Sequence, residues 1–113
     1  MENVIEKKSF DFAVKIVGLY RSLISERKET VLSKQILRSG TSIGANVAEA
    51  ERGQSRADFH AKMCIALKEA NETQYWLRLL YKTNYIMNED FEQLNRNVEE
   101  LISILVAITK NTK

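Results

Sequence analysis

The sequence FHAKMCIALKEANETQYWLRLL, residues 59–80, decides the fold class. Apolar or small residues recur in it at alternating steps of four and three: Phe59, Met63, Ala66, Ala70, Thr73, Leu77 and Leu80. This heptad spacing is typical of helices that pack side by side in bundles and coiled coils. It predicts a helix over about residues 55–82, opened by a capping box at residues 55–58 in which Asp58 replaces the usual Glu.

Three further amphipathic stretches predict helices over about residues 9–26, 30–52 and 88–110. Ser9 is the expected N-cap of the first, and Gly53 the expected left-handed residue that ends the second. The first stretch carries two adjacent apolar rows, wider than one core seam needs: Phe12, Ile16, Leu19 and Leu23 beside Ala13, Val17, Tyr20 and Ile24. Because the connections are short, neighbouring helices should be antiparallel. We therefore expect a single all-α domain over residues 1–113, an up-down-up-down antiparallel four-helix bundle.

The composition excludes several classes of protein. A hydrophobic fraction of 44% argues against a disordered chain, and the absence of proline with only 4 glycines argues against an all-β fold. A net charge of +2 is far below that of a histone-like DNA binder. The single cysteine cannot form an intrachain disulfide, and neither a signal peptide nor an apolar run of membrane-spanning length is present. We expect a cytoplasmic protein with no membrane partner.

Residues 38–50, RSGTSIGANVAEA, are the least ordinary part of the chain. Each glycine inside a helix costs about 1 kcal/mol relative to alanine. Gly40, Gly44 and Ala48 are spaced by four and form one bare stripe, which predicts close approach of another helix within or between subunits. The alternative is two tolerated glycines. A second face of the same helix carries polar side chains: Arg38, Ser42, Asn46 and Glu49. They are expected to form a hydrogen-bonded ladder, to contact another helix or to be solvated.

This segment resembles the signature of the 23S rRNA intervening-sequence protein family, with Asn46-Val47-Ala48-Glu49 as its most specific piece. The resemblance covers roughly residues 12–80 and extends to residues 35–37, 55–59, 65–73 (including Glu72) and 75–77. It implies a small bacterial four-helix bundle assembled as a homopentamer, with no established enzymatic activity. A related branch, the accessory protein of diversity-generating retroelements, works with a reverse transcriptase and is associated with nucleic-acid binding.

Candidate chemistry is sparse. His60 and Cys64 share a helix face, but zinc needs three or four ligands and the chain has no other Cys or His. A di-iron site is excluded because His60 lacks the Glu three residues earlier. Lys68 and Glu72 are expected to form a charge pair on the helix surface. We expect no enzyme, no cofactor and no bound metal.

Antiparallel topology gathers six basic residues at one end of the bundle: Lys7, Lys8, Arg52, Arg56, Lys110 and Lys113. Acidic residues share this end, so a solvated surface explains most of this cluster of charges. A ring of subunits, however, would repeat the cations into a phosphate-binding surface.

Tyr75, Trp76 and Tyr81 are expected to pack against helices or a subunit partner, and no stacking platform for bases is evident. The surplus apolar width of the first helix, with Tyr75 and Trp76 outside the core row, predicts a homo-oligomer. We therefore expect a non-enzymatic oligomer that binds RNA, DNA or a nucleic-acid enzyme; the alternative is a protein-interaction scaffold with no nucleic-acid ligand.

Overall fold

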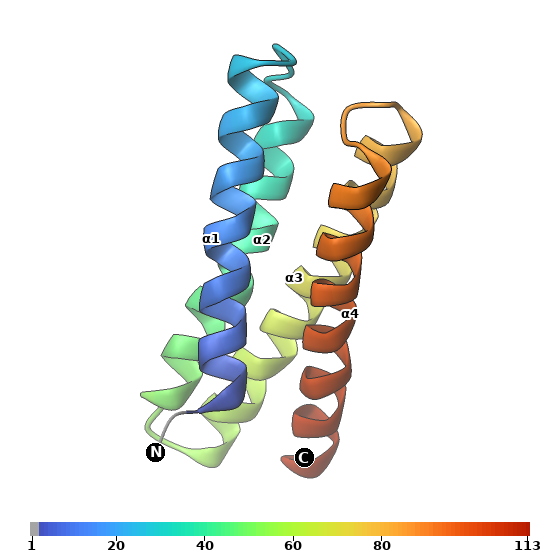
Figure 1. Ribbon diagram of the computed structural model, residues 1–113. Helices are drawn as coiled ribbons and strands as arrows, with labels where there is room; N and C mark the ends of the chain where they lie inside the picture. Colours follow the sequence, from blue (N-terminus) through green and yellow to red (C-terminus); the bar gives the residue numbers. More distant parts are fainter. Residues whose placement is uncertain (1–2) are drawn as a thin grey trace.

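The computed structural model describes residues 3–113 and forms four helices, α1 (Val4–Ser25), α2 (Leu32–Glu51), α3 (Arg56–Lys82) and α4 (Asn88–Asn111). Residues 3–113 contain no strand. Successive helices run antiparallel, and both chain ends lie at the same end of the bundle as the α2–α3 turn (Figure 1). Each helix packs against two neighbours, α1 and α3 each contacting both α2 and α4. The predicted all-α four-helix bundle is confirmed, and no helix of the described chain is long and apolar enough to cross a membrane.

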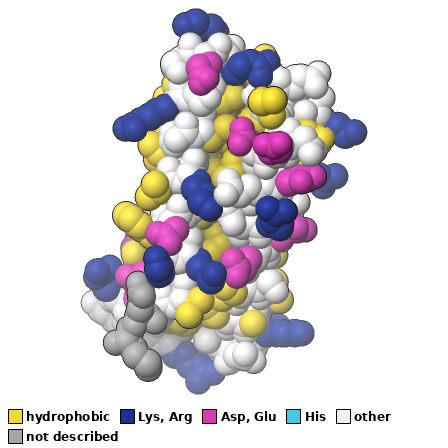
Figure 2. Space-filling model, in the orientation of Figure 1, with side chains coloured by type: hydrophobic (Ala, Val, Ile, Leu, Met, Phe, Trp, Pro, Cys, Tyr) yellow, Lys and Arg dark blue, Asp and Glu magenta, His cyan; other side chains and the backbone are white. Residues whose placement is uncertain are grey.

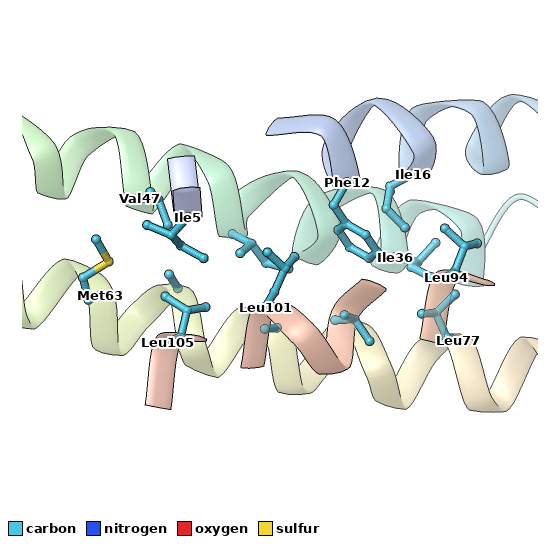
Figure 3. Packing of buried hydrophobic residues seen from close by; sticks show 14 of the residues in the cluster. Ile5, Phe12, Ile16, Ile36, Val47, Met63, Leu77, Leu94, Leu101 and Leu105 are labelled. Carbon is cyan, nitrogen blue, oxygen red and sulfur yellow. The ribbon is translucent and has the colours of Figure 1, made fainter. Parts of the chain in front are cut away.

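The core lies along the axis between the helices, where apolar side chains from all four meet (Figure 3). The heptad row of α3 is confirmed: Phe59 is half-buried, and the rest are buried, namely Met63, Ala66, Ala70, Thr73, Leu77 and Leu80. Burial of one large aliphatic side chain contributes about 1.5–3 kcal/mol, so these rows supply most of the stability.

The start of α1 differs from the sequence prediction. Asn3 is the N-cap, and its side chain accepts a hydrogen bond from the Glu6 N–H at 3.2 Å. Ser9 lies fully buried inside the helix, and its hydroxyl donates to the Glu6 carbonyl at 3.2 Å. The N-cap prediction for Ser9 is wrong, because α1 begins earlier: Ile5 is also buried and extends the apolar row two turns before Phe12.

The N-terminus of α2 is covered by Glu29. The residue is only 7% exposed, and its carboxylate accepts hydrogen bonds from the backbone N–H groups of Val31, Leu32 and Ser33 at 2.6–3.2 Å. These are donors that have no partner within a helix, and an acidic group is favoured at this end of the helix dipole. Lys28, immediately before it, adopts a left-handed backbone with φ 57°. Together they fix the turn between α1 and α2.

The α2–α3 turn follows one prediction and contradicts another. Ser55 caps α3 by accepting the Asp58 N–H at 3.1 Å, as the capping pattern predicts. The prediction that Gly53 adopts a left-handed backbone is wrong, because no glycine has a positive φ in the part of the chain that the structure describes. Instead the Gly53 N–H donates to the Ala50 carbonyl at 3.0 Å, which closes the helix end without a left-handed residue.

Candidate functional site

The glycines of α2 lie against α1. A Cβ atom on Gly40 would come within 2.9 Å of both Cγ atoms of Ile16, and one on Gly44 within 3.3 Å of the Ser9 carbonyl oxygen. Contacts below about 3.4 Å leave no room for an added methyl unless the neighbour moves. The bare stripe therefore lets α1 approach α2 closely at these two positions.

A hollow of about 680 Å³ opens where the bare stripe reaches the surface. Gly44 and Ala48 form part of its wall, and Phe10 of α1 stands at its edge. The Phe10 side chain is 68% exposed and Val14, one turn later, is 58% exposed. This pair lies outside the two predicted apolar rows of α1, and the row that includes Val17, predicted as surplus apolar width, is half-buried. The sequence does contain the signal for this pair, because Phe10 and Val14 are apolar residues spaced by four, beside the two predicted rows.

The polar face of α2 forms no ladder of side chains. Ser42 donates to the Arg38 carbonyl at 2.6 Å, and Asn46 donates to the Ser42 carbonyl at 2.8 Å. Glu49 pairs with Lys62 of α3 at 2.9 Å, so only this member contacts another helix. The Arg38 guanidinium is exposed and makes no hydrogen bond or ion pair within residues 3–113.

Four of the six basic residues at the chain-terminal end are engaged within the molecule. Lys7 pairs with Asp11 at 3.0 Å, and Lys8 pairs with Glu100 of α4 at 3.2 Å. Arg52 donates to the Ala48 carbonyl at 3.2 Å.

Arg56 links α3 to the end of α4. Its guanidinium donates to the Asn111 carbonyl at 3.1 Å and to the Thr112 carbonyl at 3.5 Å, where a cation is favoured by the helix dipole. Only Lys110 and Lys113 of the six are exposed and make no described hydrogen bond or ion pair.

The face built by α1 and α4 carries charges of both signs (Figure 2). Basic and acidic side chains are interspersed along it, with a line of hydrophobic atoms between the two helices. Lys8–Glu100 is one such pair, and Lys15 of α1 donates to Asn97 of α4 at 3.0 Å. A surface of alternating sign produces no strong field, so this face is a poor candidate for a polyanion.

His60 and Cys64 form a hydrogen-bonded chain near the same end. The Cys64 sulfur lies 3.4 Å from His60 Nε2, and His60 Nδ1 lies 2.8 Å from the Thr112 hydroxyl oxygen. The Thr112 hydroxyl also donates to the Ile108 carbonyl at 2.8 Å, which links the chain to the end of α4. No group of three potential metal ligands occurs among the described residues.

Tyr75, Trp76 and Tyr81 of α3 have different surroundings. Trp76 is half-buried and its indole N–H donates to Glu72 at 3.0 Å, while Tyr81 stacks on Phe91 with ring centroids 4.3 Å apart. Tyr75 is 58% exposed. The predicted pair between Lys68 and Glu72 is wrong, because the Glu72 carboxylate binds the indole and Lys68 makes no ion pair in the described chain.

The fold and these surfaces define a small helical-bundle protein with an exposed apolar face and scattered free cations. The family model of the 23S rRNA-intervening sequence protein matches residues 1–107, and the chain belongs to this family. The resemblance predicted from residues 38–50 is thus confirmed at the level of the family.

Among solved structures, the chain is similar to a protein of unknown function from the S23 ribosomal protein family of Bacteroides thetaiotaomicron. The two are 58% identical, the match covers 94% of this chain and 98% of that one, and the TM-score is 0.92. No curated protein sequence matches the chain.

Proposed function

We propose that the protein is a non-enzymatic, cytoplasmic homo-oligomer, a pentamer by family resemblance, that binds RNA, DNA or a nucleic-acid enzyme. The observation that supports assembly is the exposed pair Phe10 and Val14 on α1, of which Phe10 lines the hollow at Gly44 and Ala48. Large apolar side chains next to a concave surface favour a protein partner, because leaving them in water is unfavourable. A second copy of the chain is the partner that is always available to it.

Light scattering of the purified protein at micromolar concentration tests the assembly. We expect several times the subunit mass of 13.0 kDa. Phe10→Glu combined with Val14→Glu should give monomers, because charges buried in an apolar contact are costly. Val106→Glu is the matched control, since Val106 is an exposed apolar residue on α4, and it should leave the assembly intact. A wild-type protein of subunit mass would refute the proposal.

Two cations without a described partner, Lys110 and Lys113, support a contact between the chain-terminal end and nucleic-acid phosphates. An assembly with rotational symmetry repeats Lys110 and Lys113 around its axis, together with the partly engaged Lys7, Lys8, Arg52 and Arg56. Cations that neutralise phosphates release counterions, so binding should weaken steeply with salt. Lys110→Gln with Lys113→Gln should reduce both the affinity and the salt slope. Arg56→Ala is a poor probe here, because it also removes the link to α4.

A protein-interaction scaffold is the second candidate. The observation that favours it is that four of the six predicted phosphate contacts already have partners inside the molecule. An intact oligomer that fails to bind RNA or DNA even at low salt would favour this scaffold and exclude the nucleic-acid ligand.

A further inference from the structure

One row of α3 is exposed along its whole length. Lys68, Asn71, Tyr75, Arg78 and Lys82 follow each other at steps of three and four, which places them on one helix face, and all five are exposed. We call these five residues the α3 row. From Lys68 to Lys82 the row spans about 21 Å at the helical rise of 1.5 Å per residue.

The three cations of the α3 row are free. None of Lys68, Arg78 and Lys82 makes a hydrogen bond or ion pair through its side chain within residues 3–113. Three carboxylates of α3 and α4 are held by neutral donors: Glu72 by Trp76 at 3.0 Å, Glu92 by Asn88 at 3.1 Å and Glu99 by Asn95 at 3.4 Å. The row therefore keeps its three cations available to an external anion.

Tyr75 is an exposed aromatic ring held in place from one side. Its ring meets the Trp76 ring edge to face, with centroids 5.0 Å apart and an interplanar angle of 76°. Trp76 is itself fixed by its hydrogen bond to Glu72 and by packing against the core. An aromatic side chain ordered before binding loses little entropy when a planar group stacks on it.

The α3 row ends at a hollow of about 460 Å³ beside the α3–α4 turn. Lys82 belongs to both the row and the hollow. Tyr81 and Met87 supply apolar surface, Met87 being 75% exposed, and Asn84 supplies an amide group. The Asn88 amide also lines the hollow but is held by the Tyr81 hydroxyl at 2.7 Å and by Glu92 at 3.1 Å. Apolar walls with a few hydrogen-bonding groups suit a planar heterocycle better than a peptide backbone or a bare phosphate.

We propose that the α3 row binds single-stranded nucleic acid. Lys68, Arg78 and Lys82 contact phosphates, Tyr75 stacks on a base, and the hollow at the turn receives an unstacked base. Free cations interleaved with an exposed, ordered ring are the combination by which proteins bind single strands. A duplex offers its phosphates but not its base faces, so it gains nothing from Tyr75. The inference rests on the proposed nucleic-acid function and adds a single-strand contact on α3 to the phosphate contacts at the chain-terminal end.

Fluorescence anisotropy tests the proposal, with a labelled 20-nucleotide single-stranded RNA, the same sequence as single-stranded DNA, and its duplex. Tyr75→Ala should weaken single-strand binding about 5- to 150-fold, whereas Tyr75→Phe, which keeps the ring, should retain it. Lys68→Gln with Lys82→Gln should lower the salt slope by about 1.4. Lys34→Gln is the matched control: an exposed lysine on α2 that likewise has no described partner.

The outcomes separate this inference from the function on which it rests. Light scattering must first show that every variant keeps the wild-type mass. If the wild type binds single strands and Tyr75→Ala binds as tightly, the α3 row is refuted while nucleic-acid binding stands. If Lys110→Gln with Lys113→Gln abolishes single-strand binding while the α3-row variants bind like the wild type, the strand contacts the chain-terminal end and the α3 row is refuted. A wild type that binds no probe at low salt overturns both proposals, and tighter binding of RNA or of DNA identifies the natural strand.

Discussion

The hydroxyl oxygens of Ser39 and Thr73 lie 2.9 Å apart and join α2 to α3 inside the core. Both side chains are fully buried, and Thr73 also donates to the Glu69 carbonyl at 2.7 Å. The Thr73 hydroxyl is thus within donor distance of both the Ser39 hydroxyl and the Glu69 carbonyl, and its single proton is shared between the two acceptors. Ser33, also fully buried on α2, has a hydroxyl with no hydrogen-bond partner. Two serines in one helix thus have opposite energetic consequences.

Replacement of these serines by alanine should change stability in opposite directions. Ser33→Ala removes a buried polar group without a partner and should raise the free energy of unfolding by about 1 kcal/mol. Ser39→Ala loses a satisfied hydrogen bond and should lower it by about 1 kcal/mol. Urea denaturation at one fixed protein concentration measures both. A destabilised Ser33→Ala would mean that its hydroxyl is satisfied by water.

Gly40 and Gly18 offer a second matched pair. A methyl group at Gly40 would meet Ile16 at 2.9 Å, whereas nothing lies within 4 Å of one at Gly18 in the middle of α1. Gly18→Ala should therefore stabilise the protein by about 0.5–1 kcal/mol, the usual gain from removing a helical glycine. Gly40→Ala should destabilise it by about 1–2 kcal/mol, because overpacking outweighs that gain. Equal melting temperatures for the two variants would contradict the close approach of α1 and α2.

Glu29→Ala should destabilise the α1–α2 turn. The substitution leaves the Val31, Leu32 and Ser33 N–H groups without their shared acceptor, at a cost of about 1–2 kcal/mol. Glu26→Ala is the control, because Glu26 is exposed and accepts only the Ser22 hydroxyl, at 3.1 Å. Thermal unfolding should shift for the first variant and barely change for the second. Similar shifts would show that Glu29 acts by charge alone.

Gly44→Leu should alter both packing and assembly. The new side chain meets the Ser9 carbonyl at its root and extends toward the hollow beside Phe10, with an overpacking cost of about 1–3 kcal/mol. Ala45→Leu adds the same side chain at the next position, which is exposed, and should leave the melting temperature and the mass unchanged. Wild-type stability and mass for Gly44→Leu would mean that the glycine is merely tolerated.

The sequence was sufficient for the architecture because helical periodicity is a local property. The unbroken row from Met63 to Leu80 predicts a buried stripe on α3, and the short connections leave only antiparallel neighbours. The capping box at Ser55 was equally local, since its acceptor and donor are three residues apart. The segment around Asn46 also sufficed to predict the family, which the match over residues 1–107 confirms.

Features that depend on which side chains meet across helices could not be predicted in this way. Glu29 covers the start of α2 only because the turn folds its carboxylate back, and Ser9 is buried because α1 lies against Gly44 of α2 there. The free cations of the α3 row were hidden for the same reason: Lys68 was assigned to Glu72 by spacing, yet Trp76 binds that carboxylate. Local sequence determined which residues form helices and which face is apolar. Tertiary packing alone decided which charges are neutralised and which side chains stay in water, because each depends on competing partners brought within a few ångströms by the fold.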